Sequence, residues 1–148
     1  MENYVLEQIE EIFEEMGLQY HCNGKGRIGV GLSDYCLMFH AAQDGLEFRL
    51  QMNLEVPVEY RIEMLEFLNN INCIIKEGHW ELEEDGEVAF RIYTDLSLKS
   101  EVEEGRVLQV MKKAINAADA FRDGMIKISL GADAPKELFE EAIERLSI

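Results

Sequence analysis

Four glycines form the first segment whose spacing suggests a chemistry. Gly24, Gly26, Gly29 and Gly31 are spaced much as in a glycine-rich phosphate-binding loop. Such a loop follows a strand and opens a helix, because the helix N-terminus holds the phosphate. Here the glycines lead into an alternating stretch typical of a strand, and no Lys-Ser or Lys-Thr follows. We therefore interpret them as a hairpin turn and as strand positions that other atoms approach closely.

Histidine and cysteine side chains are the next candidates, because both types bind transition metals. No pair of them has the tight spacing of a structural zinc site. Cys36 and His40 fall on one side of an expected strand, but four residues apart they are too distant to share a small ion. The sequence therefore predicts no metal site. The residues considered are His21, Cys22, Cys36, His40, Cys73 and His79.

Nucleophilic catalysis needs a cysteine or serine with a histidine and an orienting acid. Cys73 falls on the less apolar side of an expected helix and Cys22 lies beside an expected turn, and neither has the electropositive setting of a reactive thiolate. We interpret the cysteines as small packing residues. The Glu-rich runs at 7–15 and 81–87 are typical of solvated faces. The sequence thus predicts no catalytic residue and no cofactor, and we expect a protein that is not an enzyme.

Three asparagines stand out because they interrupt an apolar helix, where asparagine has poor propensity. Of Asn69, Asn70 and Asn72, Asn72 falls within the apolar arc and Asn69 just beyond its edge. A buried amide must be hydrogen-bonded. We expect these side chains to tie the helix to adjoining backbone, for which the turn at Gly78–Trp80 is the candidate. Recognition of a ligand is the alternative.

The elements that position these residues follow from the hydrophobic period. Apolar residues recur at helical spacing in four segments and alternate in two others, with glycine, proline or Asp-Gly at the boundaries. Strands that come in runs rather than singly between helices predict an α+β fold. The expected order is a helix over 2–16, strands within 20–55 that turn at Asp44–Gly45, a helix from Pro57 to about Glu77, a hairpin over 79–97 that turns at Asp85–Gly86, a long helix from about 103 to 129, and a last helix over 135–147.

The second helix has more apolar surface than one contact can bury. Its apolar residues cover about half of the circumference, whereas a surface helix needs a stripe of only about 100°. We therefore expect two packing partners, of which the second is another helix of this chain or the same helix in a dimer. Tyr60, Phe67 and Ile74 extend the arc, and we predict them as dimer or partner contacts.

Composition narrows the class of partner. The 148 residues form one expected domain, 1–148, with 47% hydrophobic residues and a formal charge of −16 from 14 basic and 30 acidic residues. Such a charge disfavours nucleic acid and anionic membranes, and either keeps the protein soluble or steers a basic partner. No apolar run reaches the roughly 18 residues of a membrane span. The first sixteen residues lack a basic start, so we expect no secretory signal and a cytoplasmic protein with reduced thiols.

A family resemblance rests on the second helix and the hairpin after it. Leu68-Asn69-x-Ile71-Asn72, then Gly78-His79-Trp80, then Asp85-Gly86-x-Val88-x-Phe90-Arg91, resemble the bacterial YbjN family, whose members are described as sensory transduction regulators. That family looks like the fold of class I type III secretion chaperones, which are small acidic cytoplasmic homodimers that hold an extended partner segment. The resemblance implies structural roles for Asn69, Asn72, Gly78, Trp80, Asp85, Gly86 and Arg91. It carries over no catalytic residue.

Three hypotheses follow for the function. The first is a non-enzymatic protein-binding or regulatory domain of the YbjN type that forms a homodimer. The second is a secretion-type chaperone for an extended partner segment. The last helix, over 135–147, is a departure from those chaperones. The third is a small-molecule-binding domain whose pocket would be lined by the glycines at 24–31 and the helix asparagines.

Overall fold

The computed structural model describes residues 2–23, 25–41, 45–95 and 104–146. The order of its elements confirms the α+β class, while the expected turn residue Asp44 lies outside the described residues. The elements are α1 (Glu2–Glu15), β1 (His21–Cys22), β2 (Arg27–Gly31), β3 (Tyr35–Ala41), β4 (Gly45–Glu55), the short 3-10 helix η1 (Val58–Tyr60), α2 (Arg61–Asn72), β5 (His79–Leu82), β6 (Glu87–Asp95), α3 (Glu104–Ser129) and α4 (Pro135–Leu146).

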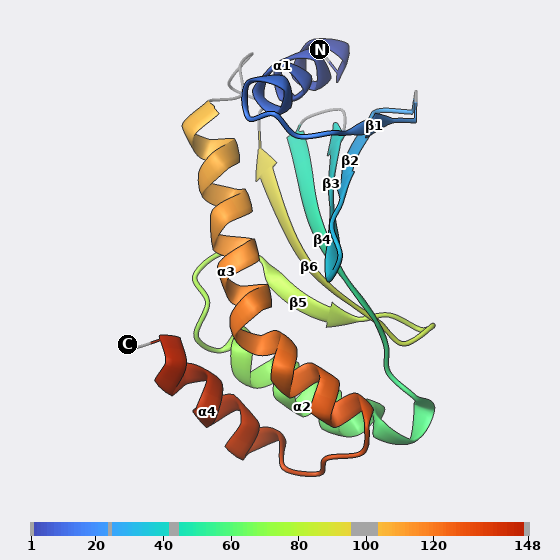
Figure 1. The fold of residues 1–148 in the computed structure, drawn as a ribbon, viewed down its shortest axis with the longest axis vertical. Helices are drawn as coiled ribbons and strands as arrows, with labels where there is room; N and C mark the ends of the chain where they lie inside the picture. The colour runs from blue at the N-terminus through green and yellow to red at the C-terminus, as the bar shows by residue number, and fades with distance from the viewer. Residues whose placement is uncertain (1, 24, 42–44, 96–103, 147–148) are drawn as a thin grey trace.

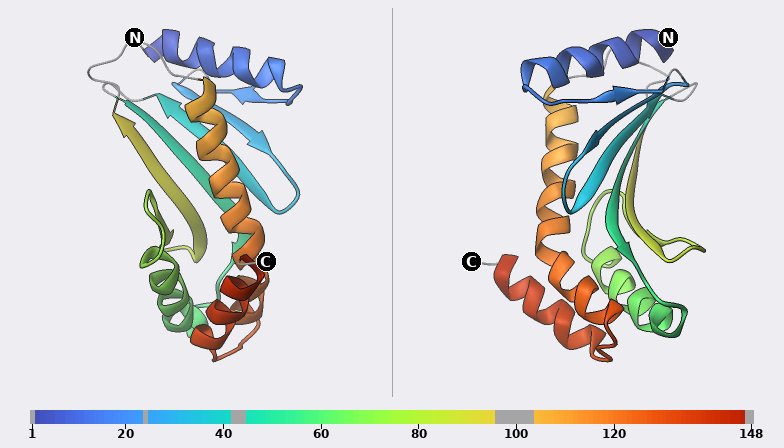
Figure 2. Two further views of the ribbon diagram at one scale, coloured as in Figure 1. Left: turned by 90° about the vertical axis from the view of Figure 1, so that its left-hand side faces the viewer. Right: turned by 45° about the vertical axis from the view of Figure 1, so that its right-hand side comes forward.

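All six strands join one antiparallel sheet in the order β1-β2-β3-β4-β6-β5. The sheet is therefore completed within a single chain, with β1 and β5 at its edges. Helix α3 runs along one face and α1 lies across one end, whereas α2 and α4 lie together at the other end (Figures 1 and 2). Side chains alternate strictly between buried and half-buried along β3, which places one face on the core.

The core fills the space between the sheet and its helices and continues between α2, α3 and α4. Phe13 of α1 and Phe48 of β4 both contact the ring of Phe39, with centroid distances of 5.8 and 4.9 Å. At the other end, the ring of Phe121 stacks on Phe139 of α4. One apolar core thus connects the sheet to all four helices.

Helix α2 is shorter than the sequence pattern predicted. It begins at Arg61 after the η1 turn and ends at Asn72, not at Glu77. The chain must leave the helix early for two reasons: Glu77 pairs with α3, and Gly78 adopts a positive φ of 74° as it enters β5. A Cβ at position 78 would come within 2.5 Å of the Phe90 ring, so only glycine fits there.

The second packing partner of α2 lies within the same chain, which makes the prediction of Phe67 as a dimer contact wrong. Phe67 is fully buried, and its ring meets Phe121 of α3 edge-on at 6.1 Å. Gly124 makes room for it, because a Cβ there would lie 2.7 Å from the Phe67 ring. Tyr60 is half-buried and Ile74 is 52% exposed. The helical periodicity correctly indicated that the apolar surface of α2 is wider than one packing contact needs. It could not show which side of α2 the helices α3 and α4 cover.

Candidate functional site

The motif asparagine Asn72 holds the backbone of Trp80 with both halves of its amide. The Trp80 N–H donates to Asn72 Oδ1 at 2.7 Å, and Asn72 Nδ2 donates to the Trp80 carbonyl at 3.0 Å. Strand β5 is an edge strand, so the amide occupies the place that a further strand would take. The predicted tie between the helix and the Gly78–Trp80 turn is thus present for Asn72. Asn69 is exposed to solvent.

The hairpin turn connects β5 and β6 to the start of α2. Asp85 Oδ1 accepts the Glu87 backbone N–H, and Gly86 adopts a φ of 90°. The Gly86 carbonyl accepts the Val56 N–H at 2.8 Å, and Arg61 donates to the Glu84 carbonyl at 2.8 Å. The expected turn residues Asp85 and Gly86 therefore lock the hairpin onto the segment that leads into α2.

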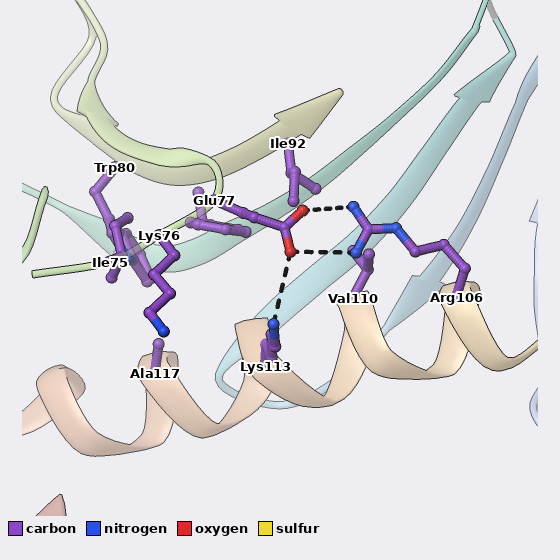
Figure 3. Close-up of a pocket in the computed structure, with 10 residues that line it drawn as sticks. Ile75, Lys76, Glu77, Trp80, Ile92, Arg106, Val110, Lys113 and Ala117 are labelled. Carbon is purple, nitrogen blue, oxygen red and sulfur yellow. Dashed lines mark hydrogen bonds and ion pairs between the residues drawn. The ribbon is translucent and has the colours of Figure 1, made fainter. Parts of the chain in front are cut away.

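A cavity of about 400 Å³ lies between α3, the α2–β5 connection and strands β5 and β6 (Figure 3). Such a volume falls within the range of small-molecule sites. Trp80 lines the cavity and is 3% exposed, yet its indole Nε1–H has no hydrogen-bond acceptor in the part of the chain that the structure describes. The apolar lining residues are Ile75, Trp80, Phe90, Ile92, Val110 and Ala117.

Charged side chains form the rim of this cavity. Arg106 of α3 donates two hydrogen bonds to the Glu77 carboxylate, at 3.3 and 2.6 Å, and Lys113 lies 3.6 Å from the same group (Figure 3). Lys76 reaches from the α2–β5 connection toward Ala117 and forms no ion pair with any described residue. Arg106 and Lys113 therefore share one carboxylate, and Lys76 adds a third cation to the rim. This is a local positive excess on a chain of formal charge −16.

The cations at the rim lower the pKa of the Glu77 carboxylate. The hydrogen bonds from Arg106, with the nearby Lys113 ammonium, hold the pKa of Glu77 below its ordinary value, although burial opposes the shift. The folded-state pKa is thus lower than that of the unfolded chain. At pH values above the pKa of Glu77 in the unfolded chain, the ion pair contributes its full stabilisation of the fold. This contribution is lost as the pH falls through the pKa of Glu77 in the folded protein.

We expect Glu77→Gln to lower the melting temperature at neutral pH and to match the wild type at acid pH, because Glu77 is then protonated in both states. The effect is at most about 1 kcal/mol, since the Glu77 side chain is 39% exposed. Thermal unfolding of both proteins across the acid range measures it. Glu66→Gln, at an exposed position of α2, is the control. A difference between Glu77→Gln and wild type that persists at acid pH would contradict the assignment.

The sheet face opposite α3 carries a network of ion pairs. Arg49 of β4 and Arg91 of β6 lie directly opposite each other in the register. Glu81 of β5 lies near both, 2.9 Å from Arg91 and 3.9 Å from Arg49. Arg49 also pairs with Glu83, and Arg91 with Glu47. The motif residue Arg91 therefore acts in a structural network that offsets the repulsion between two facing guanidinium groups.

A strip of exposed apolar side chains runs along η1 and α2. Val58, Ile62 and Leu65 are 72%, 77% and 52% exposed, and their spacing places them on one side of the helix. We call Val58, Ile62 and Leu65 the α2 strip. It borders the buried arc on the side away from Phe67.

The histidines and cysteines do not assemble into a site among the described residues. His21, His40 and His79 lie on three different strands, β1, β3 and β5. Partial desolvation by neighbouring atoms and a hydrogen bond to Glu10 raise the pKa of the Cys22 thiol to about 11, which disfavours a reactive thiolate. Cys22 and Cys73 are exposed, so the expectation that they are packing residues was wrong.

Three carboxylates do meet at the hairpin turn, but they have structural partners. Within the described ranges, Glu83, Asp85 and Glu87 are the group whose oxygens come close enough for a shared ion. Glu83 already pairs with Arg49, and Glu87 accepts from Gln51. Asp85 accepts from the turn backbone. These bonds account for the cluster as part of the hairpin.

The glycine segment is a strand and its turn, not a phosphate loop. Gly26 has a φ of 77° and precedes β2, in which Gly29 lies close to the Leu37 carbonyl. Gly24 lies outside the described residues. The cavity beside α3 is lined by none of these glycines and by neither Asn69 nor Asn72, so it is a different pocket from the one that the sequence suggested. The unpaired Trp80 indole depends on tertiary contacts and left no signal in the sequence.

An antiparallel sheet, its helical cover and an asparagine-held hairpin define an α+β domain. The sequence profile of the YbjN family, described as "Putative bacterial sensory transduction regulator", matches residues 6–127, and the chain belongs to this family. Helix α4 lies beyond the matched residues. The fold is similar to the crystal structure of YbjN from E. coli, with a TM-score of 0.56 and 9% identity over 74% of this chain and 82% of that one. No curated protein matches the sequence.

In the described ranges, none of the helices combines the length and the apolar character that crossing a bilayer requires.

Proposed function

We propose that this chain is a non-enzymatic regulatory domain that acts by binding protein, and that it forms a homodimer through the α2 strip. The exposure of Val58, Ile62 and Leu65 is the observation that carries the proposal. Adjacent exposed apolar side chains on one helix side are typical of an interaction site, whereas scattered ones are ordinary. A second copy of the same strip would cover it by a two-fold contact.

The charge of the chain makes self-association distinguishable from the binding of a basic partner. Two copies, each of formal charge −16, repel each other at low ionic strength. Added salt screens this repulsion and therefore favours the homodimer. Added salt would weaken a complex with a basic protein instead.

The three free cysteines support a cytoplasmic location as part of this proposal.

We expect light scattering over a concentration series to show a species of twice the 17.0 kDa chain mass, which increases with salt. Replacing both Ile62 and Leu65 by serine is expected to shift this species to the monomer. The circular dichroism spectrum of the monomeric variant should be unchanged, because both side chains are more than half exposed in the chain itself. Its melting temperature should fall only by the contribution of association.

The matched control is Leu32→Ser, which removes a leucine that is 41% exposed just after β2 and away from α2. It should leave the dimer intact. A wild-type chain that stays monomeric at every concentration and salt would refute the homodimer. A dimer that survives the double serine variant would place the interface elsewhere.

A further inference from the structure

We propose that the cavity between α3 and strands β5 and β6 binds a small amphipathic monocarboxylate, with the apolar body inside and the carboxylate at the basic rim. This site is separate from the α2 strip and does not depend on assembly through it. The apolar wall of the cavity and the charges of its rim favour such a ligand.

The wall of the cavity selects an apolar body. Trp80, Phe90 and Ile92 of the hairpin face Val110 and Ala117 of α3 across a space of about 400 Å³. The Trp80 and Phe90 rings contact each other at a centroid distance of 5.6 Å, so two aromatic faces form one side. Apolar atoms of a ligand would gain contacts there that water cannot supply.

The backbone of Trp80 is held in place at the cavity wall. Its N–H donates to Asn72 Oδ1 at 2.7 Å, and its carbonyl accepts from Asn72 Nδ2 at 3.0 Å. These two bonds hold the strand that carries the indole before any ligand arrives.

The rim selects a single negative charge. Arg106, Lys113 and Lys76 provide three cations, and Glu77 neutralises only part of their charge. A carboxylate matches the guanidinium group of Arg106 in geometry. The formal charge of −16 on the chain disfavours larger anions such as polyphosphates. The Glu77 side chain competes for the same cations, and its loss should therefore strengthen ligand binding.

The chain contains a single tryptophan, so its fluorescence reports on this cavity directly. We would titrate the full chain with decanoate, an aliphatic carboxylate, and with phenylpropionate, an aromatic carboxylate without an indole ring. Decanol has the apolar chain without the carboxylate, and acetate has the carboxylate without the apolar chain. We expect a saturable change with at least one carboxylate, and affinity at least about tenfold weaker for decanol and acetate.

Three variants test the assignment of the groups. Arg106→Gln should weaken carboxylate binding about tenfold, whereas Glu77→Gln should strengthen it. Ala117→Phe, which fills the cavity from a half-buried position on α3, should abolish binding. Lys112→Gln, one residue from Lys113 but exposed and outside the cavity lining, is the matched control and should bind as the wild type does.

The proposal fails if no probe gives a saturable change, or if decanol binds as tightly as decanoate. It also fails if Ala117→Phe retains binding while its circular dichroism and melting temperature show a folded protein. If Ala117→Phe does not fold, the test depends on the other two variants. The carboxylate affinity of Arg106→Gln is then compared with that of Lys112→Gln. Equal affinities for these two variants would overturn the assignment of the rim.

Discussion

Replacing Phe67 by alanine is expected to lower the free energy of unfolding by about 3–5 kcal/mol. The side chain is fully buried where α2 meets α3, and its ring contacts Phe121 and fills the space left by Gly124. Truncation removes these apolar contacts and leaves a cavity, because closely packed neighbours relax only partly into the space. Urea denaturation followed by circular dichroism measures the change.

Ile74→Ala is the control for this experiment, since Ile74 is another large apolar residue just beyond the end of α2 but is 52% exposed. It should change the free energy of unfolding by no more than about 0.5 kcal/mol. If Phe67 were an interface residue, as the helical pattern suggested, its replacement would alter the mass in solution and leave the monomer's stability unchanged. That result would contradict the packing described for α2.

The second large effect is expected at Asn72. Alanine at this position removes both hydrogen bonds to Trp80 and leaves a backbone N–H and a carbonyl at the sheet edge without their partner. Each lost partner costs about 1–3 kcal/mol where the group stays buried, so we expect a total loss of about 2–4 kcal/mol. The fluorescence of Trp80 should also change in the folded state, because the strand that carries the indole is no longer held.

Asn69→Ala provides an unusually close control, because it removes the same side chain from the same helix one turn earlier. Asn69 is exposed, so its replacement should be nearly neutral. Chemical denaturation of both variants, with fluorescence spectra recorded before unfolding, separates the two roles. Equal losses at Asn69 and Asn72 would mean that the bonds to Trp80 do not explain the effect, since the higher helix propensity of alanine favours stability at both positions.

Several features of this protein followed from local sequence because their causes are local. The alternation along β3 and β4 and the Asp85–Gly86 turn predicted the strands and the hairpin that the structure contains. Gly131, which has a φ of 105°, ends the long helix where the sequence placed the end. Asn72 was also identifiable, since an amide inside an apolar arc requires a partner nearby in the chain.

Other features were decided only by tertiary structure, because they depend on which distant elements meet. A helical period shows that α2 has surplus apolar surface, but α3 and α4 determine that Phe67 is buried and that Ile62 is exposed. The rim of the cavity joins Glu77 to Arg106, which lies 29 residues further along the chain. No spacing rule connects two such positions, since their approach depends on how α3 crosses the sheet.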